Sequence, residues 1–267
     1  MISITGGLPR ARAEDDSLGK VISIAGKGGV GKTTIAGLFV LELCKRGSPV
    51  LAIDADPNFN LGERLGVVVS TTIGSLREQL MKSKDELPAG VSKQELVDYQ
   101  MRLALQEEEC FDLLTMGRQE GPGCYCYINS ILRSFTDALA SKYAYVIIDN
   151  EAGLEHLSRR TTIGSDLLLV ISDSSAAALK AAGRIARLSD EMELKVKRKI
   201  LIVNRLDEKT GQGIMQIPEY SFDAVHNVRK DPSLEPRTGD LSLSASPIQN
   251  SPAAADVRAI INAELGR

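Results

Sequence analysis

One glycine-rich stretch constrains what this chain can fold into more than any other feature. Residues 26–34 read GKGGVGKTT, directly after the apolar run VISIA and directly before the helical run TIAGLFVLELCKR. A β-rich run, a loop of the G-x-x-x-x-G-K-[ST] pattern and a helix, in that order, are the context of a phosphate-binding loop. Glycines let backbone N–H groups point at phosphate oxygens, and the helix N-terminus favours negative charge. The motif therefore predicts a nucleotide site at the first βα turn.

Short β-rich runs alternate with longer helical runs along the rest of the chain. The β-rich runs are VISIA, VLAID, FDLLT, YVIID, LLLVIS and KILIV, and the helical runs include residues 34–46, 128–140 and 253–265. Alternation of this kind predicts parallel βαβ units. We therefore expect an α/β fold, an open and mostly parallel β-sheet with helices on both faces, with a terminal helix that packs onto the sheet.

Two regions depart from this alternation. Residues 1–19 are rich in glycine, proline and charge without a clear period, so we expect a flexible tail before a single domain over residues 20–267. Between about residues 70 and 108 the pattern predicts two helices that form a flap. Ser92 and Glu95 stand at capping-box spacing and are expected to open the second helix.

Composition argues against several classes of function. The formal net charge is −3 and like charges form no long block, so we expect no nucleic acid and no membrane partner. No run approaches the roughly 20 apolar residues that span a membrane, and the first residues lack a signal-peptide pattern, which predicts a cytoplasmic protein. Because cytosolic thiols stay reduced, we expect four free thiols or ligands: Cys44, Cys110, Cys124 and Cys126.

The residue types of the loop suit a nucleotide with Mg²⁺. The residues expected to contact ATP or ADP are Gly28, Gly29, Val30, Gly31, Lys32, Thr33 and Thr34. Lys32 is expected to reach the β- and γ-phosphates, and Thr33 to offer a hydroxyl to Mg²⁺. Asp149 ends the apolar run YVIID and is placed to hold that ion through water. An aspartate at a strand end can also be only a cap.

Lys27, inside the loop, makes the sequence resemble the deviant Walker A class of P-loop ATPases, which includes MinD, ParA and the nitrogenase iron protein. The resemblance implies that this lysine crosses to the nucleotide of a second protomer. There it would neutralise charge on the transferred phosphoryl group, as an arginine finger does. An ATP hydrolase that forms a homodimer when ATP is bound is therefore expected. The alternative for Lys27 is a solvated lysine in a loop.

The same resemblance assigns residues that follow other strands. Asp54 and Asp56, in DADPN, correspond to switch I, where Asp56 orients the attacking water and Asp54 helps to hold Mg²⁺. Carboxylates after a strand are also common in turns. Gly153, in DNEAG, corresponds to switch II, whose backbone N–H senses the γ-phosphate. Asn204 and Arg205 follow the run KILIV, where this class recognises adenine through the asparagine amide.

Two cysteines in the segment GPGCYCY form the second candidate site. Cys124 and Cys126 are separated by one residue, so in extended chain their side chains point the same way. One such pair supplies two thiolates, whereas a closed site for a soft metal generally has four ligands. A two-fold symmetric dimer would supply the other two. The alternative is two small buried cysteines in a turn.

Longer stretches around these cysteines make the chain resemble the nickel-insertion ATPases of carbon monoxide dehydrogenase maturation, the CooC/AcsF type. The resemblance rests on DLLTMGRQEGPGCYCYINSILR (residues 112–133), DNEAGLEHL (residues 149–157) and DADPN. It implies that Cys124 and Cys126 of two protomers hold Ni²⁺ or Zn²⁺ together. It also implies help in loading nickel into carbon monoxide dehydrogenase or an acetyl-CoA synthase complex.

Other interpretations of the sequence stay open. A spatial-organising ATPase like MinD or ParA would need a basic amphipathic tail or a basic surface. An ATP-gated iron-sulfur electron donor would bridge two protomers through a cluster, but its cysteines would lie far apart in sequence rather than as C-x-C. Cys44 and Cys110 are expected in the core. His156, in the switch II segment, is expected to be a structural or hinge residue, and the alternative is a link between nucleotide state and the metal site.

Overall fold

The fold is built on a single eight-stranded sheet. In a computed structural model the described residues are 19–56, 58, 60–82, 99, 102–117, 138–151, 164–192, 194–207, 222–235, 242–243, 248 and 251–266. The strands are β1 (Lys20–Gly26), β2 (Val50–Asp54), β3 (Leu105–Glu107), β4 (Phe111–Thr115), β5 (Tyr145–Asp149), β6 (Ser165–Ser172), β7 (Val196–Leu206) and β8 (Ala224–Arg229). The helices are α1 (Lys32–Cys44), α2 (Asn60–Leu65), α3 (Ile73–Lys82), α7 (Ala176–Glu191), the 3₁₀ turn η1 (Pro232–Leu234) and α8 (Pro252–Leu265).

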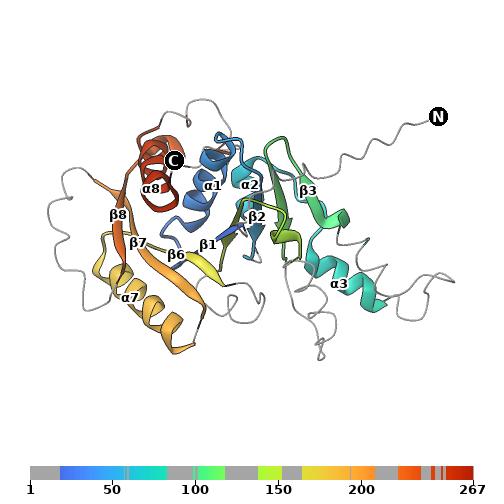
Figure 1. Cartoon of the computed structure of the whole chain (residues 1–267), viewed down its shortest axis with the longest axis horizontal. Helices are drawn as coiled ribbons and strands as arrows, with labels where there is room; N and C mark the ends of the chain where they lie inside the picture. The colour runs from blue at the N-terminus through green and yellow to red at the C-terminus, as the bar shows by residue number, and fades with distance from the viewer. Residues whose placement is uncertain are drawn as a thin grey trace.

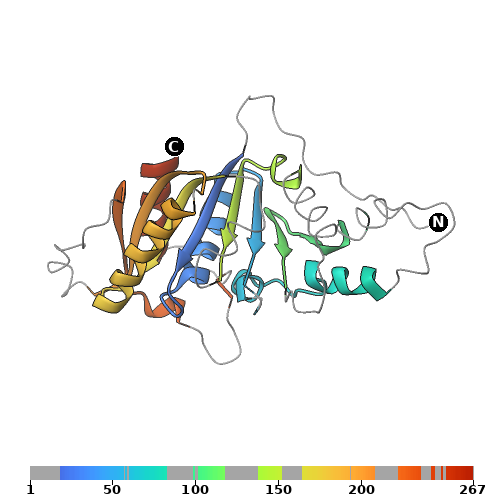
Figure 2. The same cartoon turned by 90° about the horizontal axis from the view of Figure 1, so that it is seen from below.

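The strand order is β3-β4-β2-β5-β1-β6-β7-β8. All neighbouring strands run parallel except β3 and β4, which pair antiparallel. Seen from the side, α8, α1 and α2 lie above the sheet while α7 and α3 lie below it (Figures 1 and 2). The expected open, mostly parallel sheet with helices on both faces is therefore confirmed.

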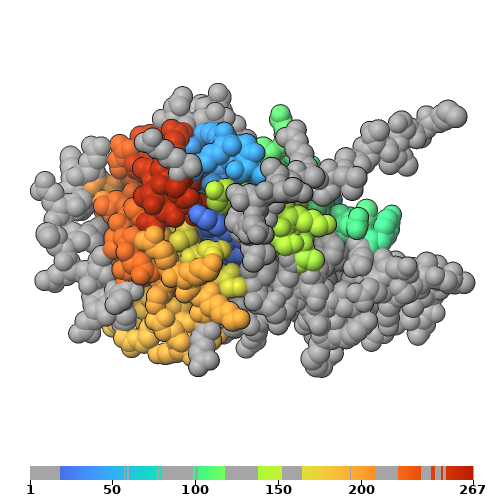
Figure 3. Space-filling view, in the orientation of Figure 1, coloured from blue at the N-terminus to red at the C-terminus, as the bar shows by residue number. Residues whose placement is uncertain are grey.

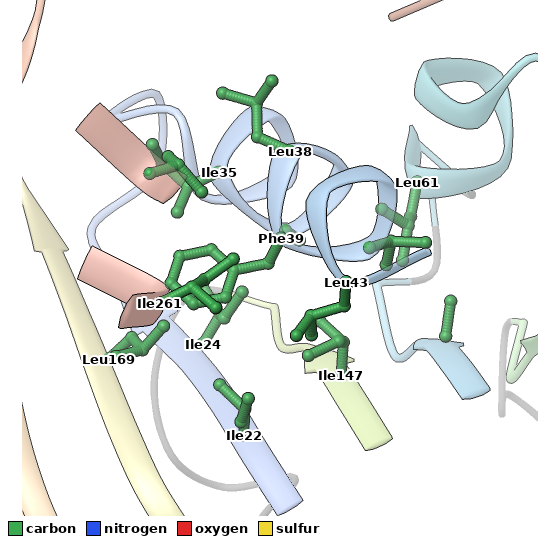
Figure 4. Close-up of a cluster of buried hydrophobic side chains, with 14 of the residues drawn as sticks. Ile22, Ile24, Ile35, Leu38, Phe39, Leu43, Leu61, Ile147, Leu169 and Ile261 are labelled. Atoms are coloured by element: carbon green, nitrogen blue, oxygen red, sulfur yellow. The ribbon is translucent and has the colours of Figure 1, made fainter. Parts of the chain in front are cut away.

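Successive residues of the central strands pack on opposite faces of the sheet. Ile22 and Ile24 of β1 are fully buried under α1, with Phe39 of that helix pointing down between the strands (Figure 4). Val21, by contrast, packs in the cluster that lies under α3. Buried on both faces, such strands read as continuous apolar runs, which is why the sequence shows them clearly.

The terminal helix α8 closes one end of the core, as expected. The Ser251 side chain accepts a hydrogen bond from the N–H of Ala254 at 3.2 Å, and Pro252 occupies the first helical position. Val257 and Ile261 are fully buried, and the helix packs beside β8 and α1 (Figure 3). The apolar side of α8 is thus used inside the molecule.

Several expectations are corrected by the structure. The predicted flap over residues 70–108 contains α3 but ends in the strand β3, which forms one edge of the sheet, and β8 at the other edge was not predicted. Cys110 is exposed, not in the core, because it lies in the bend between β3 and β4. Ser92 and Glu95 lie outside the described residues.

Candidate nucleotide site

The glycine-rich loop joins β1 to α1 with the backbone geometry that the motif requires. β1 ends at Gly26, and α1 begins at Lys32 after Gly31, which adopts φ 95° and ψ 26° in the left-handed region. Gly29 also has a positive φ of 82°. A Cβ atom on Gly31 would lie 2.4 Å from Asn204 Nδ2, so both conformation and space demand glycine there.

The two lysines of the loop have different environments. Lys32 is 8% exposed, and its ammonium donates a hydrogen bond to the carbonyl oxygen of Lys27 at 3.4 Å. The side chain of Lys27 is exposed, as are Gly28 and Gly29, and no neighbouring atom lies within 4 Å of a Cβ built on either glycine. Lys32 therefore lies within its own protomer's loop, whereas Lys27 is free to extend from the molecule.

Two buried carboxylates stand side by side at the carboxyl ends of adjacent strands. Asp54 of β2 is in register with Asp149 of β5, and β5 lies next to β1, whose end carries the loop. Asp54 Oδ1 accepts a hydrogen bond from the N–H of Asp56 at 3.1 Å, and Oδ2 accepts one from Leu61 at 2.9 Å. Burial raises the pKa of Asp54 to about 6, although these N–H donors oppose the rise. Ligands in such sheets bind outside the carboxyl ends of the strands.

Asp149 has the environment of a cation ligand. It is 1% exposed, and neither carboxylate oxygen has a hydrogen-bond partner of ordinary geometry among the described residues. Burial raises its pKa to about 7, opposed by the nearby Thr33 hydroxyl and reinforced by the charge of Asp54. A buried, unpartnered carboxylate is costly, and a divalent cation would relieve that cost. Asp149, Asp54 and Thr33 thus fit Mg²⁺ in a nucleotide site.

Asp56 shapes the turn that follows β2. Its Oδ1 accepts hydrogen bonds from both the backbone N–H and the side-chain amide of Asn58, each at 2.9 Å. The turn begins at the carboxyl edge of the sheet and leads into α2. The structure therefore brings Asp56 to the same edge as Asp54 and Asp149, and the charge of Asp56 contributes to the raised pKa of Asp149.

Asn204 and Arg205 hold the phosphate-binding loop from the far side. Between the pairs Val203–Asn227 and Leu206–Arg229, two residues of β7 face one residue of β8, which is a β-bulge, and Arg205 there has a φ of 57°. The Asn204 amide donates to the carbonyl oxygen of Val30 at 2.9 Å, and the Arg205 guanidinium donates to that of Gly29 at 3.0 Å. The bulge thus directs two consecutive side chains at the loop backbone.

Two further residues near the loop were missed from the sequence. Asp173 follows the apolar run LLLVIS of β6. Burial raises its pKa, but hydrogen bonds from Ser175, helped by the positive charges of Lys27 and Arg205, outweigh burial and lower that pKa. The rule applied to Asp54 and Asp149, a carboxylate directly after a buried strand, would have found it. The Arg64 guanidinium donates to the Thr34 hydroxyl at 3.0 Å. No local pattern marks Arg64, because this contact joins separate helices.

Four residues singled out from the sequence lie outside the described residues. They are the cysteine pair Cys124 and Cys126, the switch II glycine Gly153, and His156. Within the part of the chain that is described, no group of three or more His, Cys, Asp and Glu side chains is placed to hold a metal ion. In that same part, no helix is both long enough and apolar enough to cross a membrane.

Comparison with known proteins supports the nucleotide site. A model of the AAA domain family matches residues 19–202. An uncharacterised ATP-binding protein of Methanocaldococcus jannaschii is 43% identical over 79% of this chain and 80% of its own length. The carbon monoxide dehydrogenase accessory protein CooC of Rhodospirillum rubrum is 30% identical over 80% of this chain and 85% of its own length.

Solved structures share the fold at lower sequence identity. The MinD cell division protein of Aquifex aeolicus superposes with a TM-score of 0.64 at 21% identity, covering 93% of this chain and 97% of that chain. A ParA family ATPase from Chlorobium tepidum gives a TM-score of 0.63 at 21% identity, covering 91% and 98%. The sheet and its helices thus share their fold with MinD and ParA proteins.

Proposed function

This chain belongs to the AAA domain family and is a P-loop ATPase of the MinD/ParA class, and from that premise we propose that it is a dimerising metallochaperone. In this proposal ATP closes a homodimer in the cytoplasm, and Cys124 and Cys126 of both protomers hold Ni²⁺ or Zn²⁺. The acceptor is carbon monoxide dehydrogenase or an acetyl-CoA synthase complex. Hydrolysis then opens the dimer beside the acceptor.

The carboxylate pair at the mouth of the loop carries the ATPase part of the proposal. Thr33, Asp54 and Asp149 would hold Mg²⁺, which supplies charge neutralisation at the phosphates when bound. Lys32 binds the β- and γ-phosphates within its own protomer. Asp56 accepts a hydrogen bond from the attacking water and so orients it. The exposed Lys27 reaches the nucleotide of the partner protomer, where it stabilises charge on the transferred phosphoryl group.

Two further assignments concern the adenine base and the γ-phosphate of the nucleotide. We assign Asn204 and Arg205 to recognition of adenine, and both side chains donate hydrogen bonds to the phosphate-binding loop. Gly153 is assigned to sensing the γ-phosphate through its backbone N–H. Both assignments rest on the resemblance to this ATPase class, and the loop contacts support the first of them.

The metal cargo is supported by chemistry and by kinship. CooC, a relative over most of this chain, is an accessory protein of carbon monoxide dehydrogenase. The C-x-C pair supplies two soft ligands per protomer, and two protomers supply the four that a closed thiolate site generally has. Formation of such a site only in the ATP-bound dimer would make metal affinity depend on the nucleotide.

An anaerobic Ni²⁺ titration tests the proposal. The wild-type chain and a Cys124→Ser, Cys126→Ser variant are titrated with and without ATP, and absorbance and mass are recorded. We expect one metal ion per ATP-bound dimer in the wild type and none in the variant. A Cys44→Ser, Cys110→Ser variant serves as the matched control, since it also removes two thiols but should keep the metal. Equal binding by all three proteins would refute the shared thiolate site.

A second candidate is a spatial-organising ATPase, which the likeness to MinD and ParA favours. Such a protein would use the same nucleotide switch to bind a membrane or DNA. In this chain Val257, Ile260 and Ile261 of α8 are buried against the core, so these side chains are not offered to a membrane. ATP-dependent sedimentation with anionic vesicles or DNA, together with a negative Ni²⁺ titration, would favour this candidate instead.

A further inference from the structure

Arg64, the penultimate residue of α2, joins three separate segments of the chain. Its guanidinium Nη2 donates to the Thr34 hydroxyl oxygen at 3.0 Å and to the carbonyl oxygen of Leu234 at 3.2 Å. Its own carbonyl oxygen accepts a hydrogen bond from the N–H of Leu243 at 2.7 Å. Arg64 thus connects α2 to the first turn of α1 and to the segment after β8.

The other end of α2 is fixed at the carboxylate cluster. The N–H of Leu61 donates to Asp54 Oδ2 at 2.9 Å. Because α2 spans only residues 60–65, this contact and the one from Arg64 to Thr34 hold a single short helix at two points of the nucleotide site. The helix α2 therefore connects Asp54 to Thr34.

The chemistry of a hydroxyl determines what Arg64 does to Thr34. A threonine hydroxyl carries one proton and can accept two hydrogen bonds, whereas a guanidinium can only donate. With one lone pair of Thr34 occupied by Arg64, the hydroxyl proton must be donated elsewhere. Thr34 is half-buried and lies in the first turn of α1, directly after Lys32 and Thr33 and beside the loop whose backbone would cradle the α- and β-phosphates. When nucleotide is bound, a phosphate oxygen would be an acceptor there, in competition with the carbonyl oxygens of the preceding turn.

We infer that Arg64 is a positioning residue of the ATPase: it orients the Thr34 hydroxyl as a hydrogen-bond donor to a non-bridging α- or β-phosphate oxygen. This inference rests on the nucleotide-binding part of the proposed function. It does not depend on the metal cargo or on hydrolysis, because ADP carries both phosphates concerned.

A direct electrostatic effect on the nucleotide is the rival explanation. Burial and the neighbouring Arg205 charge both lower the pKa of Arg64, so the two guanidinium groups lie close enough to interact. Such a pair would attract any anion by charge alone. The two explanations differ in one respect: positioning acts only through the Thr34 hydroxyl, whereas attraction does not need that hydroxyl.

A double-mutant cycle on ADP affinity separates them. ADP binding is measured by calorimetry for the wild type, Arg64→Met, Thr34→Val and the double variant. We expect each single variant to bind ADP about tenfold more weakly, which is the equivalent of one lost hydrogen bond. Because Arg64 acts only through the Thr34 hydroxyl, the double variant should also bind about tenfold more weakly, and not about a hundredfold. Binding of adenosine, which lacks phosphates, should be the same in all four proteins.

Arg46→Met is the matched control. Arg46 also donates to one side-chain oxygen and one carbonyl oxygen, those of Asn262 and Gly266, but it lies beyond the opposite end of α1. We expect this variant to bind ADP as the wild type does. Equal weakening by Arg46→Met would show that lost stability, not positioning, explains the effect.

The remaining outcomes decide the inference. A hundredfold loss in the double variant would mean that Arg64 acts on the nucleotide independently of Thr34, and unchanged affinity in Arg64→Met would mean that it does not act at all. If Arg64→Met does not fold, Arg64→Lys keeps a donor and is expected to lose less than tenfold, with the same dependence on Thr34. A wild-type chain that binds no ADP would refute the proposed function itself.

Discussion

Replacement of Gly31 by alanine tests the contact between the phosphate-binding loop and β7. Gly31 has a φ of 95°, which costs an alanine about 1–2 kcal/mol. The new Cβ would lie 2.4 Å from Asn204 Nδ2, so the amide must move and lose its 2.9 Å hydrogen bond to the buried Val30 carbonyl. An unsatisfied buried acceptor costs about 1–3 kcal/mol. We expect Gly31→Ala to lower the free energy of unfolding by about 2–5 kcal/mol, the sum of these two costs.

The assay is urea denaturation of nucleotide-free protein for four chains: wild type, Gly31→Ala, Asn204→Ala and the double variant. Asn204→Ala already leaves the Val30 carbonyl unsatisfied, so Gly31→Ala in that background should cost only the backbone strain of about 1–2 kcal/mol. As a control, Gly47 has a φ of 71° but open space around its Cβ, and Gly47→Ala should show strain without coupling to Asn204. If the costs of Gly31→Ala and Asn204→Ala add within about 0.5 kcal/mol, the steric argument is wrong.

Three other predictions follow from the site and the core. Lys27→Ala should keep nucleotide affinity but lose ATP-driven dimerisation and turnover, and unchanged turnover would contradict the dimer mechanism. Asp56→Ala should bind ATP and form a stable dimer but should not hydrolyse the ATP, and phosphate release measures the hydrolysis. If this variant hydrolyses ATP at the wild-type rate, Asp56 does not orient the attacking water. Burial raises the pKa of Glu42, but hydrogen bonds from Arg258 and Lys45 outweigh burial and hold this pKa below its usual value. The ionised Glu42 should therefore stabilise the fold at pH values above the usual glutamate pKa, and this stabilisation should be lost as the pH falls through the lowered pKa of the folded protein. A Glu42→Gln variant lacks this contribution, so its melting temperature should fall less steeply on acidification than that of the wild type.

The loop and the central strands could be predicted from sequence for one physical reason. Residues 26–34 form a continuous stretch whose function lies in its own backbone, and its flanking strand and helix are local as well. The central strands are buried on both faces, so they appear as unbroken apolar runs. The sequence also predicts that Asp54 and Asp149 lie at one edge of the sheet, because each ends a strand and the carboxyl ends of parallel strands lie at the same edge.

The edge strands escaped prediction because each is buried on at most one side. β3 has three residues, Leu105–Glu107, and none of them is fully buried. β8 buries one residue of six, Val228, so its apolar signal is weak. Cys110 was expected in the core because it precedes an apolar strand, but the turn that joins β3 to β4 turns it outward.

By itself, then, the sequence determined the α/β fold, the phosphate-binding loop and the main strands along the chain, because each depends on residues that are neighbours in the chain. Only the tertiary structure decided that Asp54 lies in register with Asp149, that a bulge in β7 turns Asn204 onto the loop, and that Arg64 reaches Thr34. These contacts join segments 30 to 174 residues apart in the chain. Their partners are chosen by packing of the sheet and its helices, and no local pattern of residues encodes that choice.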